Sequence, residues 1–181
     1  DEDVSKLSDD KLSEIRNKQI GFIFQGFNLI PSLTAQANVE LPLVYRGMAA
    51  QERHELSIKA LERVGLGHRL DHRPSEMSGG QQQRVGIARA LVVDPKIIFA
   101  DEPTGNLDSK TTMEVLRLMQ RIVREQQQTL VMVTHDNYIA GFADRQFHIV
   151  DGKILKIEEK KKETQEAVQE MQDALHRGEE S

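Results

Sequence analysis

The chain has 181 residues, 38% of them hydrophobic and 29% charged, which is the composition of an ordinary globular domain. Its 24 basic and 29 acidic residues give a net charge of −5, which argues against broad binding to nucleic acid. Cysteine is absent, so disulfide bonds and thiolate metal sites are excluded, and no apolar run approaches the roughly 18–20 residues that a membrane span needs.

A polar helix and a buried strand are predicted at the start of the chain. Residues 6–18 (KLSDDKLSEIRNK) have helical character, and Ser8 is a suitable N-cap. The next segment, QIGFIFQ at 19–25, is a short apolar run that ends in the amide of Gln25. Such a run predicts a strand that is buried in a sheet.

A helical region follows this strand. Residues 34–46 predict a helix that Pro42 interrupts, because proline has no N–H to donate inside a helix. The next helix ends at Gly65, a favourable C-terminal cap, and its apolar stripe consists of Leu56, Ala60, Leu61 and Val64. His68 and His72 follow in a loop, but no third ligand is evident there and a zinc site is not expected.

The segment MSGGQQQRVGIARAL begins a further helix. Ser78 and Gln81 fit a capping box, so Gly80 or Gln81 is expected to start the helix. Its apolar face consists of Val85, Ala88, Leu91 and Val92. A capping box explains Ser78 and Gln81 but does not require two glycines.

A strand and a long helix come next. KIIFADEP at 96–103 predicts a strand, and its continuous apolar run indicates that both faces are covered. Asp108 or Ser109 can cap the helix that follows, and the side chains expected to point inward are Val115, Met119 and Ile122.

The last predicted elements are a third strand and a hairpin. TLVMVTHD at 129–136 is the strand, and residues 145–157 form a hairpin that turns at Asp151-Gly152. Residues 158–181 form a charged tail, with only a thin apolar stripe at Val168, Met171 and Leu175.

Strands that alternate with helices favour a parallel sheet in an α/β fold. Ligands of such sheets bind beyond the carboxyl ends of the strands, where Gln25, the pair Asp101-Glu102, and His135 are expected to converge. An amide, two carboxylates and an imidazole suit a metal-bound phosphate and an attacked water. Each residue taken alone also has a plainer interpretation, as a polar strand end, a loop histidine or, for Asp108, a helix cap.

The two glycines fit the same chemistry. The N-terminus of a helix offers unpaired N–H groups and partial positive charge, which suit a phosphate. Glycine lets that backbone approach the phosphate without a Cβ in between, and Ser78 adds a hydroxyl.

These motifs resemble those of ATP-binding cassette (ABC) ATPases. MSGGQ resembles the signature motif, usually written LSGGQ, with Met77 in place of the leucine. Gln25 matches the Q-loop glutamine, IIFADE the Walker B strand, GNLD the D-loop, and His135 the switch histidine. FNLIPSLTAQANVELPLVYRG and ADEPTGNLDSKT resemble the macrolide-export and lipoprotein-release branch of these transporters.

The resemblance implies a P-loop-type, RecA-like core with an inserted helical signature subdomain. Within a single cassette domain it implies a Q-loop strand region at 1–30, a helical subdomain at 31–85, a core with Walker B, D-loop and switch histidine at 86–157, and the tail at 158–181. The family's Walker A loop, Gly-x-x-x-x-Gly-Lys-Ser/Thr, is absent from the sequence. Because residue 1 is Asp rather than Met, we expect the N-terminal part of the cassette to be missing.

The resemblance also implies ATP and Mg²⁺ as ligands. Asp101 and Gln25 would serve the metal, Glu102 the attacking water, and His135 the γ-phosphate. The remaining nucleotide-binding residues would be Ser78, Gly79, Gly80, Gln81 and Asp108.

The expected function is that of the ATP-hydrolysing subunit of an ABC transporter. A second cassette in a head-to-tail dimer and a separate transmembrane permease are the expected partners, and the inner face of the cell membrane, on the cytoplasmic side, is the expected location. One rival hypothesis is a non-catalytic cassette that only contributes its signature face to a complete partner. Another is a chromosome-structure or translation-factor ATPase, which the acidic charge and the single cassette argue against.

Overall fold

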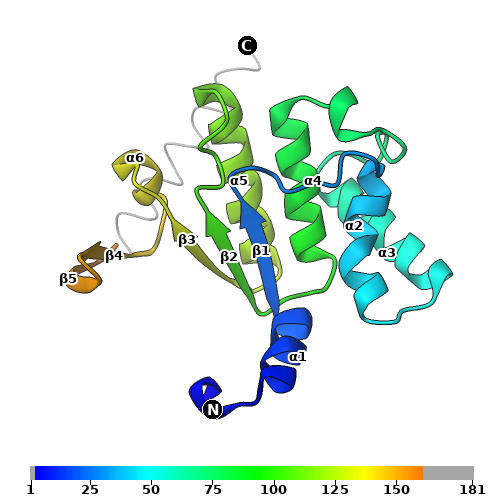
Figure 1. Cartoon of the computed structure of the whole chain (residues 1–181). Helices are drawn as coiled ribbons and strands as arrows, with labels where there is room; N and C mark the ends of the chain where they lie inside the picture. Colours follow the sequence, from blue (N-terminus) through cyan, green and yellow to red (C-terminus); the bar gives the residue numbers. More distant parts are fainter. Residues whose placement is uncertain (1–2, 161–181) are drawn as a thin grey trace. The chain divides into compact units, whose positions relative to one another are not determined.

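The computed structural model describes residues 3–160 (Figure 1). The chain divides into two compact units, Asp1–Val133 and Thr134–Ser181. The helices of the first unit are η1 (Val4–Lys6), α1 (Asp9–Gln19), α2 (Ala35–Tyr45), α3 (Ala50–Arg63), η2 (Pro74–Glu76), α4 (Gly79–Leu91) and α5 (Ser109–Glu125). Its strands are β1 (Ile20–Phe24), β2 (Ile97–Asp101) and β3 (Thr129–Val133).

The three strands of the first unit form a parallel sheet in the order β1-β2-β3, which confirms the predicted α/β arrangement. Phe24 pairs with Asp101, and Asp101 pairs with Val133, so all three strands end at the same level. The polar residues that follow or end the strands therefore begin from one edge of the sheet.

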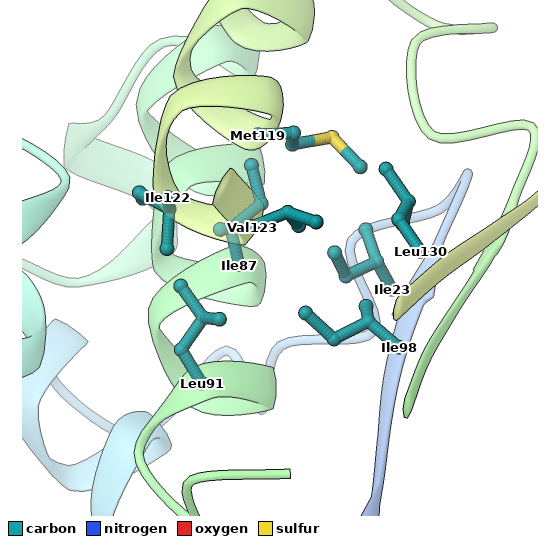
Figure 2. A pocket seen from close by; sticks show the side chains of 8 residues that line it. All are labelled: Ile23, Ile87, Leu91, Ile98, Met119, Ile122, Val123 and Leu130. Atoms are coloured by element: carbon teal, nitrogen blue, oxygen red, sulfur yellow. The ribbon is translucent and has the colours of Figure 1, made fainter. Parts of the chain in front are cut away.

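One face of this sheet is covered by α4 and α5 (Figure 1). Figure 2 shows the apolar contact between the strands and these two helices, which is made by Ile23, Ile87, Leu91, Ile98, Met119, Ile122, Val123 and Leu130. The inward residues predicted for α5 are among its buried residues. In α4, Val85, Ala88 and Leu91 are buried as predicted.

The other face of the sheet is exposed, contrary to the prediction that both faces of the second strand are covered. Side chains alternate along β2, so that Ile98 and Ala100 are buried while Phe99 remains 37% exposed. The Phe22 ring stacks on the Phe99 ring, with 5.8 Å between centroids, on this open face. A continuous apolar run therefore marks a strand but does not establish what covers it.

Helices α2, α3 and α4 pack together beside the sheet (Figure 1). Pro42 lies inside α2, and the helix continues past it to Tyr45, so the predicted interruption is wrong. Val39 and Leu43 are completely buried, and their packing outweighs the one hydrogen bond that proline removes. Gly65 has a φ of +77°, which is the left-handed conformation expected of a residue that ends a helix.

The second unit contains a short helix and a hairpin. The helix is α6 (Asn137–Ala140), and β4 (Arg145–Val150) pairs antiparallel with β5 (Lys153–Glu159). Asp151 and Gly152 form the turn, with φ angles of +49° and +73°, as predicted for a tight hairpin. Strand β5 takes in the first residues of the predicted tail, and the stripe at Val168, Met171 and Leu175 lies outside the described residues.

No helix within residues 3–160 combines the length and the apolar character that crossing a membrane requires.

Candidate functional site

The edge at which β1, β2 and β3 end carries most of the predicted site. Gln25 directly follows β1, Asp101 is the last residue of β2, and Glu102 comes next. The backbone N–H of Glu102 donates to the carbonyl of Val133 at 3.0 Å, which fixes Glu102 at the end of β3. His135 belongs to the second unit, two residues after β3, and its membership of the site stays a prediction.

The backbone at Glu102 adopts an uncommon conformation. Its φ is +43°, in the left-handed region that residues with a Cβ rarely occupy. A tight turn follows, in which the N–H of Gly105 donates to the carbonyl of Glu102 at 3.0 Å. The turn leads the chain away from the sheet and leaves Glu102 at its edge.

Gln25 is paired with Asn106, which lies in the predicted D-loop but was not among the expected site residues. The Asn106 Nδ2 donates to the Gln25 carbonyl at 3.0 Å, and the Gln25 Nε2 lies 3.4 Å from the Asn106 Oδ1. A Cβ on Gly105 would lie 2.6 Å from the Gln25 Nε2. The loop that follows β2 therefore holds the side chain that follows β1.

The segment after Gln25 is held by Arg89 of α4, which was also missed. Phe27 and Asn28 both have positive φ angles, +60° and +49°. The Arg89 guanidinium donates to their carbonyl oxygens, at 3.0 Å to Phe27 and 2.5 Å to Asn28. An arginine inside a helix gives no local sequence signal for such a contact.

The N-terminus of α4 forms the predicted capping box. The Gln81 N–H donates to the Ser78 hydroxyl at 3.3 Å, and the Ser78 N–H donates to the Gln81 Oε1 at 2.9 Å. The helix begins at Gly79, one residue before the predicted start. Its first turn contains no acidic residue, so nothing within it opposes the approach of an anion.

The two glycines have different surroundings. A Cβ on Gly79 would lie 3.3 Å from a methyl carbon of Leu107 and 3.6 Å from the Phe27 ring. A Cβ on Gly80 would collide with the Thr111 methyl group at the start of α5. Gly80 therefore has a packing reason of its own, which the phosphate interpretation of both glycines did not include.

Asp108 caps α5, as predicted. Its carboxylate accepts hydrogen bonds from the Thr111 hydroxyl at 2.6 Å and from the backbone N–H groups of Thr111 and Lys110 at 3.0 and 3.1 Å. The hydrogen bonds from Thr111, above all the one from its hydroxyl, lower the pKa of Asp108 below its usual value of 3.8.

The residues at the sheet edge suit a magnesium ion better than zinc. Asp101 offers a carboxylate and Gln25 an amide oxygen, the hard donors that Mg²⁺ prefers beside phosphate oxygens. Within residues 3–160, no group of three or more His, Cys, Asp or Glu residues could hold a metal by itself.

Two other segments of the sequence that could suggest ligand binding have structural roles. His72, for which a zinc site was considered, contacts Arg69, with 2.7 Å between its Nε2 and a guanidinium nitrogen. The one Gly-Lys pair in the sequence, Gly152-Lys153, lies at the turn of the hairpin and is not a phosphate-binding loop.

Residues 2–105 match the ABC transporter family. The chain belongs to the ABC transporter family. This match confirms the resemblance on which the sequence motifs were interpreted. The segment that resembles the ABC signature is the start of α4, and the segment that resembles the Walker B strand is β2.

Relatives in this family include exporters and simpler ATP-binding proteins. The macrolide export ATP-binding/permease protein MacB of Marinobacter nauticus is 51% identical over 154 residues, which are 85% of this chain and 24% of that protein. An uncharacterised ABC transporter ATP-binding protein of Thermotoga maritima is 52% identical over 157 residues, which are 87% of this chain and 67% of that protein. The chain thus spans about a quarter of the MacB relative and two thirds of the other.

A solved ABC structure has the same fold. It is described as the dimeric structure of a post-hydrolysis state of the ATP-binding cassette MJ0796 bound to ADP and Pi. Its TM-score to this chain is 0.73 at 45% identity, with 85% of this chain and 68% of that chain covered. The predicted ABC cassette fold is confirmed, and the boundaries expected for the helical subdomain at 31–85 stay a prediction.

Proposed function

We propose that this chain is part of the ATP-hydrolysing subunit of an ABC transporter, which drives export or extraction of a substrate through a separate permease. The observation that carries the proposal is the register of the sheet. It sets Gln25, Asp101 and Glu102 at one edge, with the strands ending level. The family match and the MacB relative, which is named for macrolide export, support the same function.

The proposed roles follow from the chemistry of each group. Asp101 and Gln25 hold Mg²⁺, which when bound neutralises charge on the phosphates. Glu102 orients and deprotonates the attacking water, and His135 contacts the γ-phosphate.

The signature segment serves the partner's nucleotide. Ser78, Gly79 and Gly80 approach the γ-phosphate held by the second cassette of a head-to-tail dimer, with Gln81 and Asp108 beside them. The dimeric state named for MJ0796 supports this arrangement. The dimer acts at the cytoplasmic face of the membrane, where closure moves the permease and hydrolysis resets it.

The role of Glu102 is tested in a protein that joins this chain to a phosphate-binding loop. Glu102→Gln should keep ATP binding and slow hydrolysis roughly 10²- to 10⁴-fold, because the amide cannot accept the proton of water. Glu125→Gln, at an exposed position near the end of α5, is the matched control and should hydrolyse ATP at the wild-type rate. Turnover of Glu102→Gln within a few-fold of wild type would exclude it as the base.

The 181-residue chain by itself should not bind or hydrolyse ATP. It contains no Walker A sequence, so no backbone cradle and no lysine are present for the β- and γ-phosphates. Two copies cannot complete each other, because both lack the same half of each composite site. Calorimetry with Mg-ATP measures this, and micromolar binding that Asp101→Ala abolishes would contradict it.

The absence of a Walker A sequence also supports a second hypothesis. A cassette without Walker A could contribute only its signature face to a complete partner, without hydrolysing ATP at its own site. The genomic sequence upstream of Asp1 separates the two hypotheses. An in-frame Walker A motif supports the ATPase, and a stop codon without one supports the non-catalytic cassette.

A further inference from the structure

Gln83 of α4 is a completely buried amide that the proposed function leaves unused. Its Nε2 donates to the carbonyl of Pro103 at 2.6 Å and lies 3.4 Å from the carbonyl of Phe24. Its Oε1 is buried without a hydrogen-bond partner among the described residues. A helix that only needed to pack could carry an apolar side chain here and would avoid the unpaired oxygen.

The orientation of this amide is determined by its neighbours. Both nearby groups are carbonyl oxygens, which accept hydrogen bonds and cannot donate them. Rotating the amide by half a turn would place Oε1 against two acceptors and leave Nε2 without either. The donor role of Gln83 is therefore fixed by geometry.

The two carbonyls belong to the residues that flank the proposed machinery. Phe24 directly precedes Gln25, and Pro103 directly follows Glu102. The Pro103 carbonyl belongs to the turn in which Glu102 has a φ of +43°. A backbone held in that region reverts to a commoner conformation unless its surroundings hold it, and Gln83 supplies such a contact.

We propose that Gln83 is a positioning residue, which fixes Glu102 and Gln25 relative to the signature helix. It stands five positions after Ser78, the N-cap of the same helix, so a displacement of the signature segment is carried to both residues through one side chain. The consequence for catalysis rests on the proposed function, whereas the restraint on the turn does not.

The restraint can be measured on the 181-residue chain without nucleotide. Gln83→Met keeps the size of the side chain and removes the donor. Amide hydrogen exchange at Gly105 and Leu107, whose N–H groups close the turn onto Glu102 and Thr104, should accelerate about tenfold, the order expected when a buried carbonyl loses its donor.

Gln82→Met is the matched control. Gln82 is the preceding residue of the same helix, and its amide donates to the carbonyl of Met77, at 3.1 Å, within its own segment. In the Gln82→Met variant, the amide exchange rates of Gly105 and Leu107 should stay within twofold of wild type. Equal acceleration of exchange in the two variants overturns the proposal. A uniform rise of exchange through α4, α5 and β2 in Gln83→Met also overturns it, because Gln83 would then support the fold as a whole.

A second variant tests the donor by pH. Gln83→Glu places a carboxyl group against two carbonyls, where the ionised form repels and the protonated form donates. Protection of Gly105, corrected for intrinsic exchange rates, should be lost at pH 8 and regained at pH 5. Protection that does not change with pH overturns the donor role.

The effect on catalysis is read in the protein that carries a phosphate-binding loop. Gln83→Met should lower kcat about tenfold and leave KM for ATP within twofold, because the base is displaced while nucleotide contacts remain. An unchanged kcat overturns the catalytic consequence. If the parent protein hydrolyses no ATP, the proposed function fails, and the exchange measurement still decides the restraint.

Discussion

The N-termini of α4 and α5 lie against each other and are capped in opposite ways. They meet where Gly80 faces the Thr111 methyl group. Helix α4 begins with neutral Ser78 and two glycines, and no acid lies in its first turn. Helix α5 begins with Asp108, whose carboxylate takes two backbone N–H groups and the Thr111 hydroxyl.

The difference separates a helix end that is filled from one that can still receive an anion. Each helix N-terminus carries partial positive charge and unpaired N–H groups. At α5 the chain neutralises that charge with its own carboxylate. At α4 a hydroxyl and an amide satisfy the cap without charge, so the attraction for a phosphate is retained.

The strongest way to remove the difference is Gly79→Asp. The substitution gives α4 an acidic first turn, and it places a negative charge where the partner's γ-phosphate would approach. In the loop-bearing protein with Glu102→Gln, ATP-driven dimerisation should be abolished, while ATP binding to the monomer survives. Size-exclusion chromatography with and without ATP measures the first property, and calorimetry measures the second.

Gly79→Ala is the control for Gly79→Asp. Among the described residues, its Cβ meets Leu107 at 3.3 Å and Phe27 at 3.6 Å and nothing else within 4 Å, so dimerisation should be weakened much less. A Gly79→Asp variant that dimerises normally but fails to bind ATP as a monomer would show that the signature does not serve the opposite subunit.

A second way to break the comparison is to push the two helix ends apart. Gly80→Ala places a Cβ against the Thr111 methyl group, which a helical, β-branched side chain cannot easily withdraw. We expect a loss of about 1–2 kcal/mol in the free energy of unfolding, because overpacking exceeds the gain from removing a helical glycine. Urea denaturation of the 181-residue chain gives the value.

Thr111→Ser decides whether that contact is the cause. Serine lacks the methyl group and keeps the hydroxyl that donates to Asp108. The double variant Gly80→Ala with Thr111→Ser should recover most of the lost stability relative to Thr111→Ser alone. Additive losses would place the cost of Gly80→Ala elsewhere.

The smallest expected effect comes from Asp108. Asp108→Asn keeps an acceptor at the cap and removes a charge that interacts favourably with the helix N-terminus, so the melting temperature should fall by about 1–2 °C at pH 7. The folded-state pKa of Asp108 lies below the unfolded value of 3.8, so the contribution of the charge is complete above pH 3.8 and is lost as the pH falls through the folded-state pKa. The melting difference should therefore be constant from pH 7 to pH 5 and shrink below pH 4. A difference that grows toward acid would contradict this sign.

Local patterns predicted the parts of this molecule that depend on neighbouring residues. Each of three local features is formed by residues only a few positions apart in the sequence, and each is present as predicted. They are the capping box at Ser78, the cap at Asp108 and the turn at Asp151-Gly152. The level strand ends followed from the alternation of strands with helices.

Contacts between distant residues were not predictable in the same way. Gln25 and Asn106 are 81 positions apart, and Arg89 reaches Asn28 across 61. The open face of β2 and the uninterrupted α2 also depend on what else packs nearby, which an apolar run or a single proline does not specify. Gly80 must lack a Cβ because of the Thr111 methyl group, which lies on a different helix.

Because of the left-handed backbone at Glu102, selection for stability and selection for activity favour different residues at this position. A residue with a Cβ at such a φ costs about 1–3 kcal/mol, and glycine or asparagine would occupy the position more comfortably. A library of this chain selected only for thermal resistance should therefore discard Glu102 early. A library selected for turnover in the loop-bearing protein should retain it and recover stability elsewhere, so the pattern of replacement at this one position distinguishes a working cassette from one that has become a scaffold.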